Sequence, residues 1–201
     1  MKFSEIKNYL AGYTVGIAGA GGLGSNCAVA LARSGIGHLI IADHDIIDIG
    51  NLNRQYYFID QVGMKKTEAL KENIRRINPD TRIDIYNTEL TRDNIPVIFR
   101  DCDIIVEALD QSEMKEMLAE TILSVWPKRP LIIGSGLAGY GKTNKLKERT
   151  IGNTLIVCGD EVSETSDDLP PMAPRVGIVA NMQANAVVEI LMKMKDHENN
   201  T

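Results

Sequence analysis

The sequence has few cysteines, and their placement excludes two common ways of stabilising a small fold. Three cysteines occur in 201 residues: Cys27, Cys102 and Cys158. Their number is odd, they lie far apart, and none belongs to a C-x-x-C pair, so neither a disulfide framework nor a structural zinc site is expected. We expect Cys27 and Cys158 to be buried thiols, and we leave Cys102 undecided.

Long apolar runs and basic clusters are also missing. No apolar stretch approaches the roughly 18 residues that a membrane-spanning helix needs, and residues 1–5 lack the apolar core of a signal peptide. The net charge is −5, and no segment gathers lysine and arginine. These absences argue against a membrane or a nucleic acid as a partner, and they predict a cytoplasmic protein.

What the sequence does contain is a regular alternation of apolar strand and helix patterns. Hydrophobic residues make up 44% of the chain, which is enough to build a core. This alternation predicts an α/β fold, a Rossmann-like doubly wound and mostly parallel sheet with helices on both faces. The expected strands are 14–18, 38–42, 82–86, 103–108 and 131–135, and the expected helices are 23–34, 66–77 and 112–126.

The part after residue 135 has a different pattern. Short β-like pieces occur near 145–150 and 154–158, and a polar, acidic loop that we expect to be flexible follows at about 160–174. A helix is expected over 176–193. We predict one domain over 1–201, consisting of a nucleotide-binding core (1–135) and a C-terminal β/helix extension (136–201).

A glycine-rich turn follows the first expected strand and opens the first expected helix. Gly19, Gly21 and Gly24 match G-x-G-x-x-G, and Gly22 lies between them. The first glycine permits a tight turn, the second admits a phosphate close to the backbone, and the third allows close packing of helix on strand. Asp43 ends the next strand, where an acid binds ribose hydroxyls. This combination predicts a nucleotide site.

Further polar residues distinguish this chain from a plain dinucleotide site. Arg54 offers a planar fork that suits phosphate oxygens, and it lies among Asn51 and Gln55. Lys66 begins a helix, a position that favours a bound anion nearby. Asp110 follows a buried strand and is therefore expected at the same sheet edge, where a carboxylate near a triphosphate would hold Mg²⁺.

Taken together, these motifs resemble the ThiF/MoeB/HesA family, relatives of the ubiquitin-activating enzymes. The resemblance runs from about residue 14 to 191, and the chain looks most like short ThiF-type proteins of thiamine biosynthesis. It implies an adenylyltransferase that uses ATP and Mg²⁺ to activate the C-terminal Gly-Gly carboxylate of a ThiS-like, ubiquitin-like sulfur carrier. A homodimer is also expected by resemblance. The implied nucleotide-binding residues are Gly19, Gly21, Gly22, Gly24, Asp43, Asn51 and Gln55; the implied catalytic residues are Arg54, Lys66 and Asp110, the last also holding the metal.

Three other functions stay open on the sequence. A nicotinamide or flavin oxidoreductase would explain the glycine loop and Asp43, but it leaves Arg54, Lys66 and Asp110 without a shared task. A non-catalytic module that binds a ubiquitin-like protein would not need phosphate-facing residues. The branch of the family that acts on modified tRNA is disfavoured by the acidic charge.

Overall fold

Seven strands form a single sheet in the computed structural model, which describes residues 1–198. The strands are β1 (Thr14–Ala18), β2 (His38–Ala42), β3 (Arg82–Tyr86), β4 (Ile104–Glu107), β5 (Leu131–Gly134), β6 (Lys147–Ile151) and β7 (Leu155–Gly159). Their order across the sheet is β3-β2-β1-β4-β5-β7-β6. All neighbours pair in parallel except β6, which runs antiparallel to β7 at one edge. The expected mostly parallel sheet is therefore confirmed.

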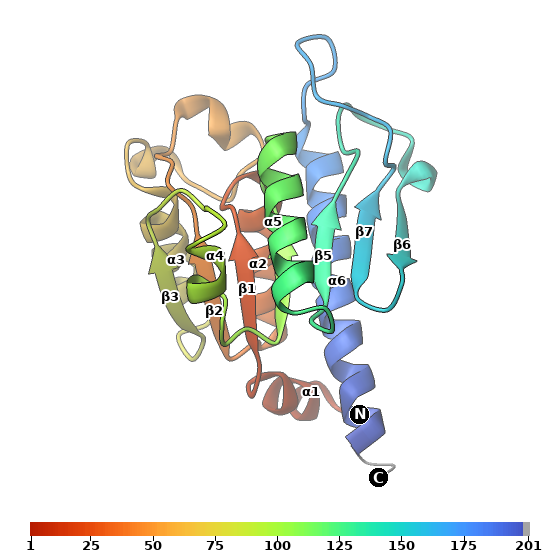
Figure 1. Cartoon of the computed structure of the whole chain (residues 1–201). Helices are drawn as coiled ribbons and strands as arrows, with labels where there is room; N and C mark the ends of the chain where they lie inside the picture. The colour runs from red at the N-terminus through yellow and green to blue at the C-terminus, as the bar shows by residue number, and fades with distance from the viewer. Residues whose placement is uncertain (199–201) are drawn as a thin grey trace.

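Helices cover both faces of this sheet, as Figure 1 shows. The α-helices are α1 (Phe3–Leu10), α2 (Gly22–Ser34), α3 (Lys66–Ile77), α4 (Ile95–Ile98), α5 (Ser112–Val125) and α6 (Ala173–Glu198), and short 3-10 turns are η1 (Ile49–Asn53), η2 (Ile59–Gln61) and η3 (Thr143–Lys145). One apolar core contains residues of α2, α3 and α6, while a second contains residues of α4 and α5. The two cores lie on opposite faces, so the central strands are apolar on both sides.

The strand order creates a natural ligand position. From β1 the chain proceeds outward to β2 and β3, and it then returns to place β4 on the other side of β1. The loops that follow β1 and β4 therefore diverge at the carboxyl ends of adjacent strands. In open α/β sheets this reversal leaves a crevice in which ligands bind.

Some elements differ from the sequence expectation. The helices α1 and α4 were not expected, and α6 begins at Ala173 rather than at residue 176. The early start is allowed because Pro174 lies in the first turn, where proline removes no intrahelical hydrogen bond. The strands β6 and β7 continue the same sheet as the core. Within residues 1–198, no helix is both long and apolar enough to cross a bilayer.

Candidate functional site

A cleft of about 700 Å³ lies at the carboxyl ends of the central strands. Its walls come from the glycine loop, the ends of β2, β4 and β5, and the loop that precedes α6. Of the residues predicted from the sequence, the cleft brings together Gly19, Gly21, Gly22, Asp43, Arg54, Gln55, Lys66 and Asp110. Segments that are far apart in the chain thus converge on one cavity.

The glycine loop has the geometry that its spacing predicts. Gly19 has φ +98°, and a Cβ there would lie 2.6 Å from the carbonyl oxygen of Ala108. A Cβ at Gly24 would lie 1.9 Å from the carbonyl oxygen of Gly19, so this glycine is required for close packing. A Cβ at Gly21 would meet only the side-chain nitrogen of Gln55, at an ordinary contact distance of 3.8 Å. The helix α2 that follows has no side-chain cap, which leaves its first amides available to an anion.

Asp43 supports this loop directly. Its Oδ2 accepts a hydrogen bond from the backbone amide of Ala20 at 2.6 Å, and its Oδ1 accepts one from the amide of Asp45 at 2.7 Å. The carboxylate is half-buried and lines the cleft. Asp43 therefore holds the glycine loop against the end of β2, and it remains within reach of a ligand.

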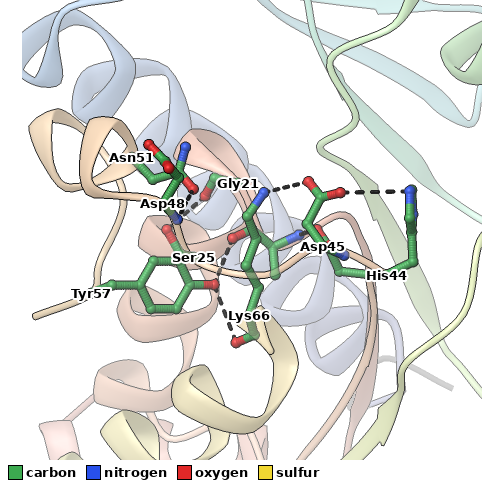
Figure 2. A network of polar contacts seen from close by, with 10 residues as sticks. Gly21, Ser25, His44, Asp45, Asp48, Asn51, Tyr57 and Lys66 are labelled. Atoms are coloured by element: carbon green, nitrogen blue, oxygen red, sulfur yellow. Dashed lines mark hydrogen bonds and ion pairs between the residues drawn. The ribbon is translucent and has the colours of Figure 1, made fainter. Parts of the chain in front are cut away.

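Lys66 and Asp45 form an ion pair at the cleft wall (Figure 2). The Nζ of Lys66 lies 2.5 Å from Oδ2 of Asp45, and the lysine side chain is only 7% exposed. Tyr57 reinforces the arrangement because its hydroxyl donates to the carbonyl oxygen of Ala20 at 2.7 Å. Burial, together with the charges of Asp43 and Asp45, raises the pKa of Tyr57 well above its ordinary value, so the hydroxyl remains a donor.

The first turns of α2 fix the segment that carries Arg54. Asn26 donates its side-chain amide to the carbonyl oxygen of Arg54 at 2.9 Å, and Ser25 accepts from the amide of Tyr56 at 3.0 Å. Arg54 itself donates to the side chain of Asn53 at 2.8 Å. These contacts place the guanidinium beside the glycine loop and leave part of its donor fork free for a ligand.

Gln55 adds a buried amide to the same wall. It is 8% exposed, and among the described residues its Oε1 has no hydrogen-bond partner. An unpaired buried acceptor is costly, so a polar ligand in the cleft would satisfy it. Asn51 lies elsewhere: its side-chain oxygen accepts from the amide of Asp48 at 3.0 Å within η1, and it is not one of the residues that line the cleft (Figure 2). Its contact with phosphate stays a prediction.

Asp110 provides the chemistry expected of a magnesium ligand. Its carboxylate is exposed at the end of β4 and lines the cleft. A hard oxygen donor beside open solvent suits Mg²⁺, which retains several waters. Within the described residues, one other group of potential ligands gathers: Asp43, His44 and Asp45, whose ligand atoms lie within 4.8 Å of one another. Because Asp43 binds two amides and Asp45 binds Lys66, that group needs no ion.

The cysteines lie outside this chemistry. All three are free and buried. Burial, with a smaller contribution from Glu148, raises the pKa of the Cys158 thiol to about 12, and burial raises that of Cys102 also to about 12. Such thiols stay protonated at neutral pH and are poor nucleophiles. The expectation that Cys27 and Cys158 are buried is confirmed.

Sequence reasoning missed a lysine that lines the cleft. Lys115 lines its wall from the first turn of α5, and it contacts Glu107 at the end of β4. A signal was present: an acid in the otherwise apolar run 104–108 requires a partner if the strand is buried on both faces.

Comparison with known proteins identifies related sequences. The ThiF family matches this sequence over residues 5–201. A probable molybdopterin-synthase adenylyltransferase from Porphyra purpurea is 32% identical over 184 residues, which cover 88% of this chain and 47% of the relative. An adenylyltransferase and sulfurtransferase, UBA4, from Candida glabrata is 30% identical over 91% of this chain and 43% of its own length. The chain thus spans about half the length of these curated relatives.

Solved structures share the fold. The E. coli tRNA N6-threonylcarbamoyladenosine dehydratase TcdA, in complex with AMP, superposes with a TM-score of 0.86 at 21% identity, covering 96% of this chain and 91% of the other. E. coli MccB, solved with ATP, gives a TM-score of 0.72 at 24% identity over 94% of this chain and 59% of the other.

Proposed function

This chain belongs to the ThiF family, and from that premise we propose that it is an ATP-dependent adenylyltransferase. The observation that carries the proposal is the convergence of Arg54, Lys66 and Asp110 with the glycine loop in one cleft of about 700 Å³. An oxidoreductase has no use for these three residues, and the relatives are named adenylyltransferases rather than oxidoreductases. The retained charged residues equally disfavour a non-catalytic module.

The proposed reaction joins two anions. A carboxylate oxygen of the acyl substrate forms a bond to the α-phosphorus of ATP, the bond from that phosphorus to the bridging oxygen breaks, and pyrophosphate leaves with the electron pair. The nucleophile is already ionised, so no general base is required. The free amides of α2 and the guanidinium of Arg54 would bind phosphate oxygens and stabilise the developing charge. Asp110 would hold Mg²⁺, which neutralises phosphate charge when it is bound.

Asp43 would bind the ribose of the nucleotide, and Gln55 would contact its phosphates. Asp43 accepts a hydrogen bond from the loop amide of Ala20 through Oδ2 and is half-buried at the cleft. Lys66 is paired with Asp45, so its charge is partly neutralised before a ligand arrives. We propose that triphosphate binding draws the ammonium of Lys66 away from Asp45, since phosphate carries the greater charge.

For the acyl substrate we propose a ThiS-like sulfur carrier with a C-terminal Gly-Gly, acting in thiamine biosynthesis. The resemblance to short ThiF-type proteins supports this choice, and the relatives in molybdopterin synthesis use the same class of reaction by name. A homodimer and a cytoplasmic location belong to the same proposal.

One experiment tests the activity. The protein is incubated with ATP, Mg²⁺ and a purified ThiS-like carrier, and the carrier is examined by mass spectrometry for an added adenylate. A carrier that lacks its final glycine serves as the control, because it cannot present the same carboxylate. A sulfur carrier of the molybdopterin-synthase type is tested in parallel.

Adenylate on the ThiS-like carrier alone supports the full proposal. Adenylate on the molybdopterin-type carrier alone retains the adenylyltransferase activity and overturns the thiamine assignment. If no Gly-Gly carrier is adenylated while NAD binds more tightly than ATP, the adenylyltransferase proposal is wrong.

A further inference from the structure

An ion pair between a half-buried lysine of the cleft wall and a fully buried glutamate lies outside the set of residues predicted from the sequence. Glu107, the last residue of β4, is 0% exposed. The Nζ of Lys115 lies 2.9 Å from its Oε1 and 2.8 Å from its Oε2. A carboxylate this deep is tolerated only with a partner, because desolvation of an isolated charge is costly. Burial raises the pKa of Glu107, and the adjacent Lys115 charge opposes that rise.

Glu107 and Lys115 both hydrogen-bond to the backbone of Leu109, one to its amide and the other to its carbonyl oxygen. The amide of Leu109 donates to Glu107 Oε1 at 2.6 Å, and Lys115 donates to the carbonyl oxygen of Leu109 at 2.9 Å. Leu109 directly precedes Asp110. The two charged side chains therefore fix the orientation of the backbone from which the Asp110 carboxylate extends.

The ammonium of Lys115 is already engaged by these contacts. Of its three donors, two are used in hydrogen bonds to Glu107 Oε1 and to the Leu109 carbonyl oxygen, both at 2.9 Å. Glu107 Oε2 lies 2.8 Å from the same Nζ, but it has no hydrogen-bond partner among the described residues. Although Lys115 lines the cleft, its geometry matches a supporting role more closely than direct contact with a substrate.

The backbone at residues 108–109 also packs closely against the glycine loop. A Cβ at Gly19 would lie 2.6 Å from the Ala108 carbonyl oxygen and 3.2 Å from the Leu109 amide nitrogen. From the other side, Gln183 of α6 donates to the carbonyl oxygen of Glu107 at 2.8 Å. The end of β4 is thus fixed from α5, α6 and the glycine loop together.

We propose that Glu107 and Lys115 are positioning residues that hold the Leu109 backbone so that Asp110 is aligned to bind Mg²⁺ beside the nucleotide. The inference rests on the proposed function, and it adds a specific coupling: the pair governs how strongly Mg²⁺ enhances nucleotide binding. A pair that only stabilises the fold would affect nucleotide binding with and without Mg²⁺ alike.

The test measures ATP affinity by isothermal titration calorimetry, with Mg²⁺ and with EDTA. In Lys115→Met the Mg²⁺-dependent gain in ATP affinity is expected to fall by about tenfold, the usual effect of removing a residue that orients a metal ligand. ATP affinity in EDTA should stay within about twofold of the wild type, and Lys115→Arg should restore part of the gain. Hydrogen exchange of the 108–111 segment should rise in Lys115→Met.

Two further variants serve as safeguards. Lys115→Met leaves the buried carboxylate of Glu107 without its partner, so this variant is expected to be destabilised. The double variant Glu107→Gln/Lys115→Met removes both charges. It is expected to fold and to show the same loss of Mg²⁺-dependent ATP affinity. Arg92→Met is the matched control. It breaks the 2.5 Å ion pair between Arg92 and Glu120, a residue on the same helix as Lys115, and it leaves the contacts of the Leu109 backbone intact.

The outcomes separate this inference from the proposed function. If the wild type binds ATP with Mg²⁺ enhancement and the double variant keeps that enhancement, the positioning role is wrong and the proposed function survives. Equal losses of affinity with and without Mg²⁺ would reduce the pair to a structural role. A wild type that binds no ATP overturns both.

Discussion

At the scale of single residues, Lys66 and Arg54 differ in how far their charges are already neutralised by neighbouring side chains. Lys66 is buried and paired with Asp45, whereas Arg54 is half-buried and spends a donor on the neutral side chain of Asn53. An arginine that faces only neutral partners retains its full charge for a ligand. We therefore expect phosphate binding to depend most on Arg54.

We expect Arg54→Ala and Asp110→Ala each to abolish carrier-dependent ATP–pyrophosphate exchange, with losses of about 10²–10³-fold or more. Arg54→Lys should recover little, because an ammonium cannot present a planar fork. The two alanine variants should unfold at the same temperature as the wild type, since the side chain of Arg54 is partly exposed and that of Asp110 is exposed. Arg92→Ala is the matched surface control, and unchanged exchange in either cleft variant would refute the assigned roles.

Cys158→Ala is expected to leave adenylate formation unchanged. The thiol is buried, and its pKa is raised to about 12, so it is not available for covalent chemistry. In the folded wild type at pH 8, iodoacetamide should label none of the three cysteines within the time that labels all of them in urea. Rapid labelling of Cys158 in the native protein would contradict this expectation.

The strand pattern was enough to predict Asp110 at the sheet edge that carries the glycine loop, whereas the family resemblance was needed to group Arg54 and Lys66 with it; all three line the cleft. They were not enough for Lys115. Its contact with Glu107 depends on how α5 turns back over the end of β4, which no spacing rule supplies. The pairing of Asp45 with Lys66 was missed for the same reason.

At the scale of elements, the segments with a regular strand or helix pattern were the most predictable parts. The bounds of β1, β2, β3 and α3 match the sequence expectation to the residue. The apolar runs of β1 and β2 reflect burial on both faces of the sheet, whereas β3 at the sheet edge has an alternating pattern and α3 has helical spacing. The helices α1 and α4 were missed because one is largely exposed and the other has only four residues with a proline in its first turn. Local propensity is weak in such cases.

The start of α6 is anchored by a buried ion pair. Arg175, 3% exposed, pairs with Asp160 and donates to the carbonyl oxygen of Gly141 at 2.7 Å. Burial alone would raise the pKa of Asp160, but hydrogen bonds from Ser163 and Val162 and the charge of Arg175 outweigh it, so the pKa lies below its ordinary 3.8. These contacts join the loop that walls the cleft to the last helix.

Because the folded pKa of Asp160 lies below the unfolded one, its charge stabilises the fold above the unfolded pKa, and this contribution disappears as pH falls through the folded pKa. Asp160→Asn should therefore cost about 2 kcal/mol at pH 7, and the difference from the wild type should shrink below pH 3.8. Urea unfolding at pH 7 and pH 3 measures both values. A difference that is constant with pH would exclude the ionised pair as its source.

At the scale of the whole molecule, the nucleotide is expected to stabilise the fold as a unit. The cleft takes its walls from segments spread between residues 19 and 176, so a ligand that binds only the folded state should raise the unfolding temperature. At about 100 times its Kd, ATP should add about 2.7 kcal/mol, or about 5–10 °C in a domain of this size. Thermal unfolding with ATP and with NAD at equal concentrations provides the measurement, and a larger shift with NAD would favour the oxidoreductase alternative.

The packing of α6 has a consequence for the order in which the protein is made. Val176 lies 3.0 Å from where a Cβ at Gly22 would be, and Gln183 binds the backbone of Glu107, so the glycine loop and the end of β4 both depend on the last helix. During synthesis the ribosome releases the glycine loop long before α6. A nascent chain would therefore contain the complete glycine loop but lack the contacts that Val176 and Gln183 supply. We expect such a chain to bind ATP only after α6 has packed against the sheet.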